Sequence, residues 1–220
     1  MIVFSDVTKR YAKKRVLCDL SLSLEKGELA FLTGPSGAGK TTLLNLIYCF
    51  DRPDSGKIVV SDVEVSSLKQ SKIPKLRRNI GIVFQDFRLF AERTVFDNVA
   101  IALQFNGMNP QKIRGYVNEM LEKVGLLHTA KVFPLCLSGG EQQRIVIARA
   151  MVSKPKVILA DEPTGNLDDD NAAAIMKLLN EISEKGTTVL IATHNKEIFH
   201  GSGQRVLYLN NSIIERDYTG

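Results

Sequence analysis

Residues 34 to 41 read Gly-Pro-Ser-Gly-Ala-Gly-Lys-Thr, and this stretch decides the fold of the 220-residue chain. It fits the pattern G-x-x-x-x-G-K-[ST] and follows the apolar run 29–32, which predicts a buried strand. Its glycines let backbone N–H groups converge on phosphate oxygens. Lys40 is expected to reach the β and γ phosphates, and the Thr41 hydroxyl to bind Mg²⁺. The apolar pattern of 43–47 predicts a helix whose positive N-terminal end faces the anion. The sequence therefore predicts a nucleoside triphosphate site.

The composition is that of a globular protein, with 44% hydrophobic residues, 29 basic and 24 acidic residues, and a net charge of +5. This excess is compatible with phosphate ligands or an anionic membrane surface, and it is too small to argue for a nucleic acid partner. The widely spaced Cys18, Cys49 and Cys136 predict reduced thiols. Neither a signal peptide nor an apolar run of about 20 residues is present, so we expect a protein that is soluble by itself.

Two apolar patterns predict two kinds of sheet. Residues 2–4 and 20–24 form short β-type runs and 57–65 reads as a hairpin, which indicates an antiparallel sheet beside the nucleotide. Residues 157–160 and 188–192 are continuously apolar, as in strands that are buried on both faces of a parallel sheet. We therefore expect an α/β fold, with the phosphate loop at the carboxyl ends of the parallel strands.

The region from about 86 to 152 has helical periodicity. Within it, Asn109-Pro110 predicts a helix start, and the apolar face that follows stops at Gly125. A later helix is predicted to end at Gly186, and residues 206–214 are typical of a final hairpin with an Asn-Asn turn.

Two carboxylates, Asp161 and Glu162, end the apolar run 157–160, where a buried charge is costly unless a cation or a reaction requires it. Asp161 suits a Mg²⁺ shell. Glu162 should point elsewhere, because strand side chains alternate, and it could polarise the attacking water. The alternative is an acidic helix start ahead of Pro163.

A second motif, Leu-Ser-Gly-Gly-Glu-Gln-Gln-Arg, occupies residues 137–144. Ser138 and Glu141 are spaced as a capping box, and the apolar residues that follow predict a helix. Taken alone, this motif is an ordinary capped helix start.

The motifs together resemble those of the ATP-binding cassette (ABC) ATPases, in which the run Leu-Ser-Gly-Gly lies between the phosphate loop and the acidic pair. The resemblance covers essentially the whole chain and implies the P-loop ABC ATPase fold with a mixed, mainly parallel core sheet. It implies a single domain, 1–220, with a nucleotide-binding core and antiparallel β subdomain in 1–85 and 153–220 and a helical signature subdomain in 86–152. It also implies a homodimer with ATP sandwiched between chains, in which Ser138 of one chain faces the γ phosphate of the other.

The resemblance also implies roles for single residues. Gln85 matches the Q-loop glutamine near Mg²⁺ and water, and Asn166-Leu167-Asp168 matches the D-loop, which contacts the opposite site. His194 matches the switch histidine that holds the γ phosphate, although alone it is typical of a polar cap at a strand end. Tyr11 matches the aromatic that stacks on adenine, although alone it is typical of a half-buried surface tyrosine.

The expected catalytic residues are Glu162, His194 and Gln85, and the expected Mg²⁺ ligands are Thr41, Gln85 and Asp161. The residues expected to bind ATP are Tyr11, Gly34, Pro35, Ser36, Gly37, Ala38, Gly39, Lys40, Thr41, Thr42, Ser138, Gly139, Gly140, Glu141 and Asp168.

Residues 160–168 are similar to the branch of the family that contains the lipoprotein-release, macrolide-efflux and cell-division ATPases. The segments most similar to the cell-division members are 31–34, 73–78, 84–89 and 93–100. This resemblance implies a Mg-dependent ATPase that dimerises on ATP and drives an FtsX-like integral membrane partner regulating peptidoglycan hydrolysis in bacterial cell division. It would be cytoplasmic, held by that partner at the inner face of the membrane.

The alternatives are the ATPase subunit of a lipoprotein-release or macrolide-type exporter and a soluble DNA-repair-type ATPase. The latter would carry long coiled coils between its nucleotide motifs, and no heptads separate Lys40 from Ser138 here.

Two surface features stay open. A basic run faces either anionic lipid or solvent, and it comprises Lys69, Lys72, Lys75, Arg77 and Arg78. An aromatic group forms either a helical core or a docking surface for the membrane partner, and it comprises Phe84, Phe87, Phe90 and Phe96.

Overall fold

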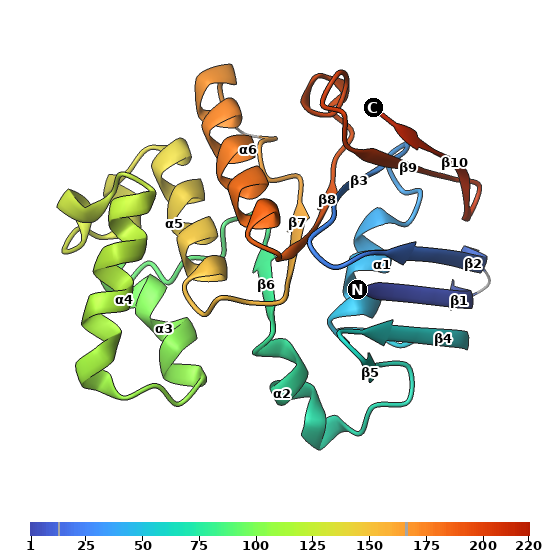
Figure 1. The fold of residues 1–220 in the computed structure, drawn as a ribbon, viewed down its shortest axis with the longest axis horizontal. Coiled ribbons are helices and arrows are strands. Elements are labelled where there is room, and N and C mark those ends of the chain that lie inside the picture. Colours follow the sequence, from blue (N-terminus) through green and yellow to red (C-terminus); the bar gives the residue numbers. More distant parts are fainter. Residues whose placement is uncertain (13, 166) are drawn as a thin grey trace.

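The computed structural model describes the whole chain except residues 13 and 166. Ten strands in the described part form a four-stranded and a six-stranded sheet, and the larger helices gather beside the latter. In Figure 1, helices α3, α4 and α5 lie on the left, the four-stranded sheet lies on the right, and the central strands run between them. The expected α/β fold is confirmed.

The six-stranded sheet has the order β10-β9-β3-β8-β7-β6. All neighbours are parallel except β9 and β10, which form a terminal antiparallel hairpin. Strands β3, β7 and β8 are almost entirely buried, as their continuous apolar runs predict. The strand bounds are β3 Leu29–Thr33, β6 Ile80–Val83, β7 Val157–Asp161, β8 Thr188–Ala192, β9 Arg205–Asn210 and β10 Ile213–Thr219.

The four-stranded sheet is antiparallel and has the order β2-β1-β4-β5. Its inner face and helix α1 enclose one apolar core, to which the sheet contributes Phe4 and the helix contributes Leu43 and Ile47. The bounds are β1 Ile2–Tyr11, β2 Lys14–Leu24, β4 Ser55–Val60, β5 Val63–Glu64 and α1 Lys40–Ile47. The antiparallel sheet and the hairpin predicted for 57–65 are therefore both present.

Helices α5 and α6 cover the face of the six-stranded sheet opposite to α1, and α3, α4 and α5 share a separate apolar cluster. The bounds are α2 Ile73–Arg77, α3 Val95–Phe105, α4 Pro110–Lys123, α5 Gly139–Met151 and α6 Asp169–Glu184. Asn109 caps α4 as expected, and Gly125 follows its end in the left-handed region at φ 72°. The division into 86–152 and 1–85 with 153–220 stays a prediction.

The last hairpin differs from the expected Asn-Asn turn. Asn210 is the last residue of β9, and the two loop residues are Asn211 and Ser212, at φ 47° and 69°. Two positive φ angles match the right-handed strand twist of a two-residue hairpin, so the turn is shifted by one residue.

The basic run lies in and directly beside a short segment made of residues 70–72 and α2, with Lys69 before it and Arg78 after it. Ile73 and Leu76 anchor this segment in the core, and Arg77 donates to the carbonyls of Tyr48 and Cys49 at 3.1 and 2.9 Å. The three lysines of the run are exposed. Arg77 is therefore a structural contact, whereas the exposed lysines are compatible both with a solvated face and with a face toward anionic lipid.

Candidate nucleotide-binding site

A cavity of about 850 Å³ opens at the carboxyl ends of β3, β7 and β8. Six separate parts of the sequence reach it: strand β2, the phosphate loop with the start of α1, the segment after β6, the end of β7, the segment after β8 and strand β9. The expected site residues that line it are Gly34, Pro35, Ser36, Gly37, Gly39, Lys40, Thr41, Thr42, Gln85, Asp161, Glu162 and His194.

The phosphate loop has the backbone that its glycines predict. At Gly34 a Cβ would lie 2.0 Å from the carbonyl oxygen of Leu209, so only glycine fits between loop and hairpin. Gly37 and Gly39 have φ angles of 76° and 110°, and the position of a Cβ on Gly37 is open space. The ammonium of Lys40 donates to the carbonyls of Gly34 and Pro35 at 2.7 and 3.1 Å.

Helix α1 offers unpaired donors to this loop. Its N-cap is Gly39, which provides no side-chain cap, and its first turn holds no acidic residue. The first amides of a helix have no partner within the helix, so the Lys40, Thr41 and Thr42 N–H groups are free for an anion. This arrangement fits a triphosphate.

Asp161 ends β7 beside Thr41, whose hydroxyl donates to its carboxylate at 2.8 Å. Burial raises the pKa of Asp161 above its ordinary value; the Thr41 hydrogen bond opposes the rise and the Glu162 carboxylate adds to it. The described residues contain no cluster of three or more His, Cys, Asp or Glu. A Mg²⁺ ion needs no such cluster when one or two protein oxygens are completed by phosphates and water, so Thr41 and Asp161 fit it.

Glu162 has different partners from Asp161. Its carboxylate accepts hydrogen bonds from the Thr193 hydroxyl and the His194 amide, both at 3.0 Å, and lies 2.6 Å from His194 Nδ1. The Glu162 side chain is 11% exposed, whereas that of His194 is 70% exposed. A carboxylate and an imidazole from two neighbouring strand ends thus form a pair at the cavity wall, with the imidazole accessible.

Several expected ATP-binding residues lie outside the cavity. These are Tyr11, Ala38, Ser138, Gly139, Gly140, Glu141 and Asp168. Ser138 caps α5 in the expected capping box, with its amide 2.9 Å from the Glu141 carboxylate. Asp168 caps α6 by accepting from the Asn171 amide at 2.9 Å. Asn166, expected in the D-loop, lies outside the described residues.

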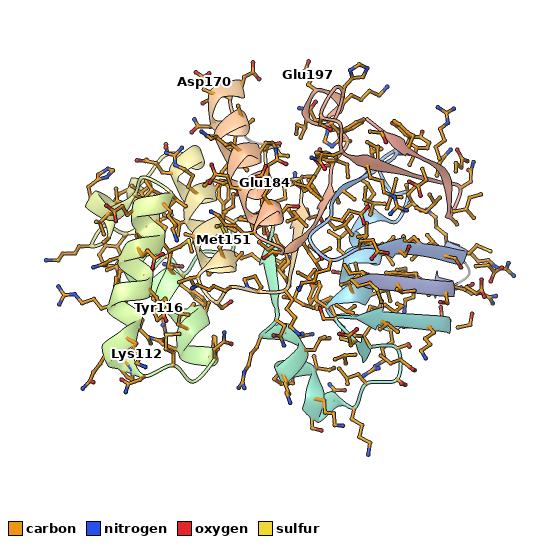
Figure 2. All side chains as sticks on the ribbon, in the orientation of Figure 1. Lys112, Tyr116, Met151, Asp170, Glu184 and Glu197 are labelled. Carbon is orange, nitrogen blue, oxygen red and sulfur yellow. The ribbon has the colours of Figure 1, made fainter. Side chains whose placement is uncertain are left out.

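The capped starts of α5 and α6 lie at one edge of the molecule. Gly140 approaches Asn171 so closely that a Cβ would meet its side chain at 2.7 Å, and Arg144 donates to Asn171 at 2.7 Å. Figure 2 shows Asp170, at the start of α6, and Glu197, just after the His194 segment, at this same edge. The motif 137–144 therefore shares an edge with the cavity but does not line it.

Four cavity residues were missed by sequence reasoning: Val16, Thr33, Lys196 and Tyr208. Lys196 had a signal, a cation two residues after His194. Val16 and Tyr208 lie in ordinary strand patterns, and only the approach of their strands to the phosphate loop reveals them.

Arg149 was also missed, and it joins α5 to the segment after Gln85. Its guanidinium donates to the carbonyls of Arg88 and Phe87 at 2.6 and 2.9 Å. Both accepting residues are left-handed, with φ angles of 49° and 53°, a conformation that costs free energy outside glycine. Burial lowers the pKa of Arg149 to about 10. The last turn of α5 thus holds the strained backbone that follows Gln85.

Replacing Arg149 by Met is expected to lower the free energy of unfolding by about 2–3 kcal/mol, because two carbonyls lose a charged donor and the strained turn loses its support. Urea unfolding measures this loss. The matched control is Lys154→Met, since Lys154 is exposed and contacts only the ring face of Tyr116 within the described interactions. If the two variants had the same free energy of unfolding, Arg149 would not support the strained backbone at Phe87 and Arg88.

The fold, with a glycine-rich loop between β3 and α1, defines a nucleotide-binding domain of the P-loop ATPase class. Comparison with known proteins specifies it further. The family model "ABC transporter" matches residues 17–165. The chain therefore belongs to the ABC transporter family of ATPases and, within it, to the cell division ATP-binding proteins called FtsE.

The relatives named cell division ATP-binding protein FtsE include those of three different bacteria. The protein of Bacillus subtilis (strain 168) is 46% identical, over 99% of this chain and 96% of its own length. That of Escherichia coli (strain K12) is 50% identical over 97% of both chains. That of Mycobacterium tuberculosis is 48% identical over 99% of this chain and 95% of its own length.

Two solved structures are similar over the whole chain. The dimeric structure of MJ0796, a bacterial ABC transporter cassette, has a TM-score of 0.91 and 36% identity, covering 100% of this chain and 98% of that one. A dimeric post-hydrolysis state of the same cassette, bound to ADP and Pi, has a TM-score of 0.90 and 35% identity over the same shares.

Proposed function

We propose that this chain binds MgATP in the 850 Å³ cavity, hydrolyses it in a dimer and drives an FtsX-like membrane partner during bacterial cell division. The observation that supports this most is the meeting, in one cavity, of a phosphate loop with the carboxylates of Asp161 and Glu162 and the imidazole of His194. The FtsE relatives favour cell division over the export alternatives.

The proposed chemistry follows from the contacts. Lys40 and the first amides of α1 would hold the phosphates, and Thr41, Asp161 and Gln85 would hold Mg²⁺, which would neutralise phosphate charge. Water would attack the γ phosphorus and give its proton to the Glu162 carboxylate, while the bond between that phosphorus and ADP breaks and ADP leaves. His194, held by its bond to Glu162, keeps an exposed ring available to the γ phosphate.

Pairing of two chains is proposed because the site is incomplete in one. The capped start of α5 presents its N-terminal end at the same edge as the cavity, without lining it. A second copy, facing the first across this edge, would bring Ser138 and the Asp168 segment to the γ phosphate. Both MJ0796 structures are dimeric, which supports the proposal.

The proposed docking surface for the membrane partner consists of two neighbouring grooves, of about 400 and 520 Å³, which share Ile82 as a wall. Gln85 lines the first groove and also the cavity, so contact with a partner there adjoins the nucleotide. Phe50 in the first groove and Phe105 in the second are 68% and 70% exposed. Among the described residues, three arginines and no acidic residue line the second groove, which favours a partner segment that brings apolar and acidic side chains to it.

The aromatic group divides between core and surface. Phe87 packs against the core beneath α5 and α6, and Phe96 packs in the helical cluster. Phe90 is 44% exposed, and the Arg88 guanidinium lies 3.9 Å from the centroid of the Phe84 ring. The docking hypothesis therefore stays a prediction for Phe84 and Phe90 and extends to Phe50 and Phe105, whereas Phe87 has a structural role.

Replacing Phe50 and Phe105 together by Ala is expected to weaken association with the membrane partner by about 1–2 kcal/mol, the scale of losing interface anchors, without changing the melting temperature. Co-purification from membranes measures the association, and thermal melting measures the stability of the variant. The control is Tyr116→Ala, an exposed aromatic on α4, at the side of the molecule away from the sheets (Figure 2). Unchanged association with a folded double variant would move the docking surface elsewhere.

The cellular role is tested by depletion of the protein. Depleted cells are expected to form chains of undivided cells. In a separate experiment, isolation of this chain from the inner face of the cell membrane should recover an integral membrane protein with it. An envelope lipoprotein defect without a division defect would instead favour lipoprotein export. Within the described residues, no helix has the length and apolar character that crossing a bilayer requires.

A further inference from the structure

Tyr11 lies at the tip of the β1–β2 hairpin, where Tyr11 pairs with Lys14. Its ring is 44% exposed, so packing alone does not fix its orientation. The Tyr11 hydroxyl donates to a carboxylate oxygen of Asp51 at 2.5 Å. Asp51 lies just beyond α1, 40 positions along the chain, and this bond therefore ties the hairpin tip to the end of the helix that begins at the phosphate loop.

Lys9 holds Asp51 in place. Its ammonium, on the nearly buried side chain, lies 2.7 Å from the second Asp51 oxygen and donates to the Arg52 carbonyl at 2.7 Å. Partial burial would raise the pKa of Asp51, but the bonds from Lys9, Tyr11 and the Arg52 amide outweigh it and lower the pKa. The carboxylate thus stays charged and keeps accepting from Tyr11.

The same ammonium lies over the Tyr11 ring, 5.0 Å from its centroid. A cation placed over one ring face occupies that face and leaves the opposite one for stacking. Burial and the Asp51 carboxylate raise the pKa of the Tyr11 hydroxyl, while the neighbouring Thr42 side chain lowers it. Tyr11 pairs with Lys14, and Val16, two residues further along β2, lines the nucleotide cavity, so the hairpin tip that carries the held ring is next to the cavity.

We propose that Lys9 and Asp51 are positioning residues for base recognition: they clamp Tyr11 by its hydroxyl and one ring face, so that its other face is ready for the adenine of ATP. This inference rests on the proposed function, since Lys9 and Asp51 can only position Tyr11 for adenine if Tyr11 stacks on the adenine of ATP. A ring already fixed loses less freedom when the base stacks, and affinity rises accordingly.

The test measures binding of ATP and of inorganic tripolyphosphate, which has the phosphates but no base, to the full chain. Asp51→Asn is expected to weaken ATP binding about fivefold and to leave tripolyphosphate binding unchanged. Tyr11→Phe, which removes only the exposed hydroxyl, should give the same loss. The double variant should lose less than the product of the two single losses, because both changes act on the same Tyr11–Asp51 bond. For Asp51→Asn, turnover at saturating ATP should stay within about twofold, so its loss appears in KM.

The matched control is Glu64→Gln, which breaks the Lys57–Glu64 ion pair on the same sheet and is expected to change neither affinity. Equal weakening of ATP and tripolyphosphate by Asp51→Asn would show a structural effect on the phosphate loop and overturn the inference. Full ATP affinity in Asp51→Asn, or losses that multiply in the double variant, would also overturn it. Tyr11→Ala tests the adenine-stacking role of Tyr11 separately from its positioning by Lys9 and Asp51. If this variant leaves ATP affinity unchanged, the adenine-stacking role itself is wrong.

Discussion

Glu162→Gln is expected to lower ATP turnover about 10²- to 10⁴-fold while ATP still binds. The amide keeps the size of the side chain and can still accept from Thr193 and the His194 amide, but it cannot take a proton from water. Lys40 and the free amides of α1 remain to hold the phosphates. The ATP-bound dimer should therefore persist, because its nucleotide is not consumed.

Phosphate release measures the turnover, and size measurement with ATP and Mg²⁺ detects the persistent dimer. The matched control is Glu197→Gln, since Glu197 is exposed at the same edge of the molecule and does not line the cavity (Figure 2). A Glu162→Gln enzyme that hydrolyses ATP at the parental rate would remove Glu162 from the general-base role.

Ser138→Arg is expected to abolish ATP-dependent pairing and to lower turnover at least about 10²-fold, while each chain still binds ATP. Within the residues that the structure describes, the Ser138 hydroxyl is bonded only to Glu141 of its own capping box, and Ser138 lies outside the cavity. A long cation there would block the close approach of a second copy. Nucleotide titration and size measurement, carried out on the same sample, separate binding from pairing.

The loss of the serine cap provides a further comparison. Ser138→Ala removes the capping hydroxyl, at a cost of about 1 kcal/mol in stability, without adding bulk. Pairing should therefore be impaired far less in Ser138→Ala than in Ser138→Arg. Mixing Ser138→Arg with Lys40→Ala can restore at most one site with both halves intact, so full activity of the mixture would contradict a two-chain site.

The sequence by itself determined the elements that short-range chemistry controls. The glycine-rich loop, the capping box of Ser138 and Glu141, and the continuous apolar runs of β7 and β8 each fix backbone conformation within a few residues. Because such signals are local, the fold class and most of the cavity residues could be predicted. The hairpin turn was displaced by one residue because neighbouring polar residues offer similar turn chemistry.

Only the tertiary structure decided which distant residues meet. The contacts of Glu162 with His194, of Tyr11 with Asp51 and of Arg149 with the Phe87 carbonyl each join separate elements. It likewise packed the partly buried Phe87 against the core and left Phe50 exposed. Periodicity shows which face of an element is apolar. Which neighbour that face meets depends on how all the elements pack, because the free energy gained by burying apolar surface comes from contacts spread over the whole core.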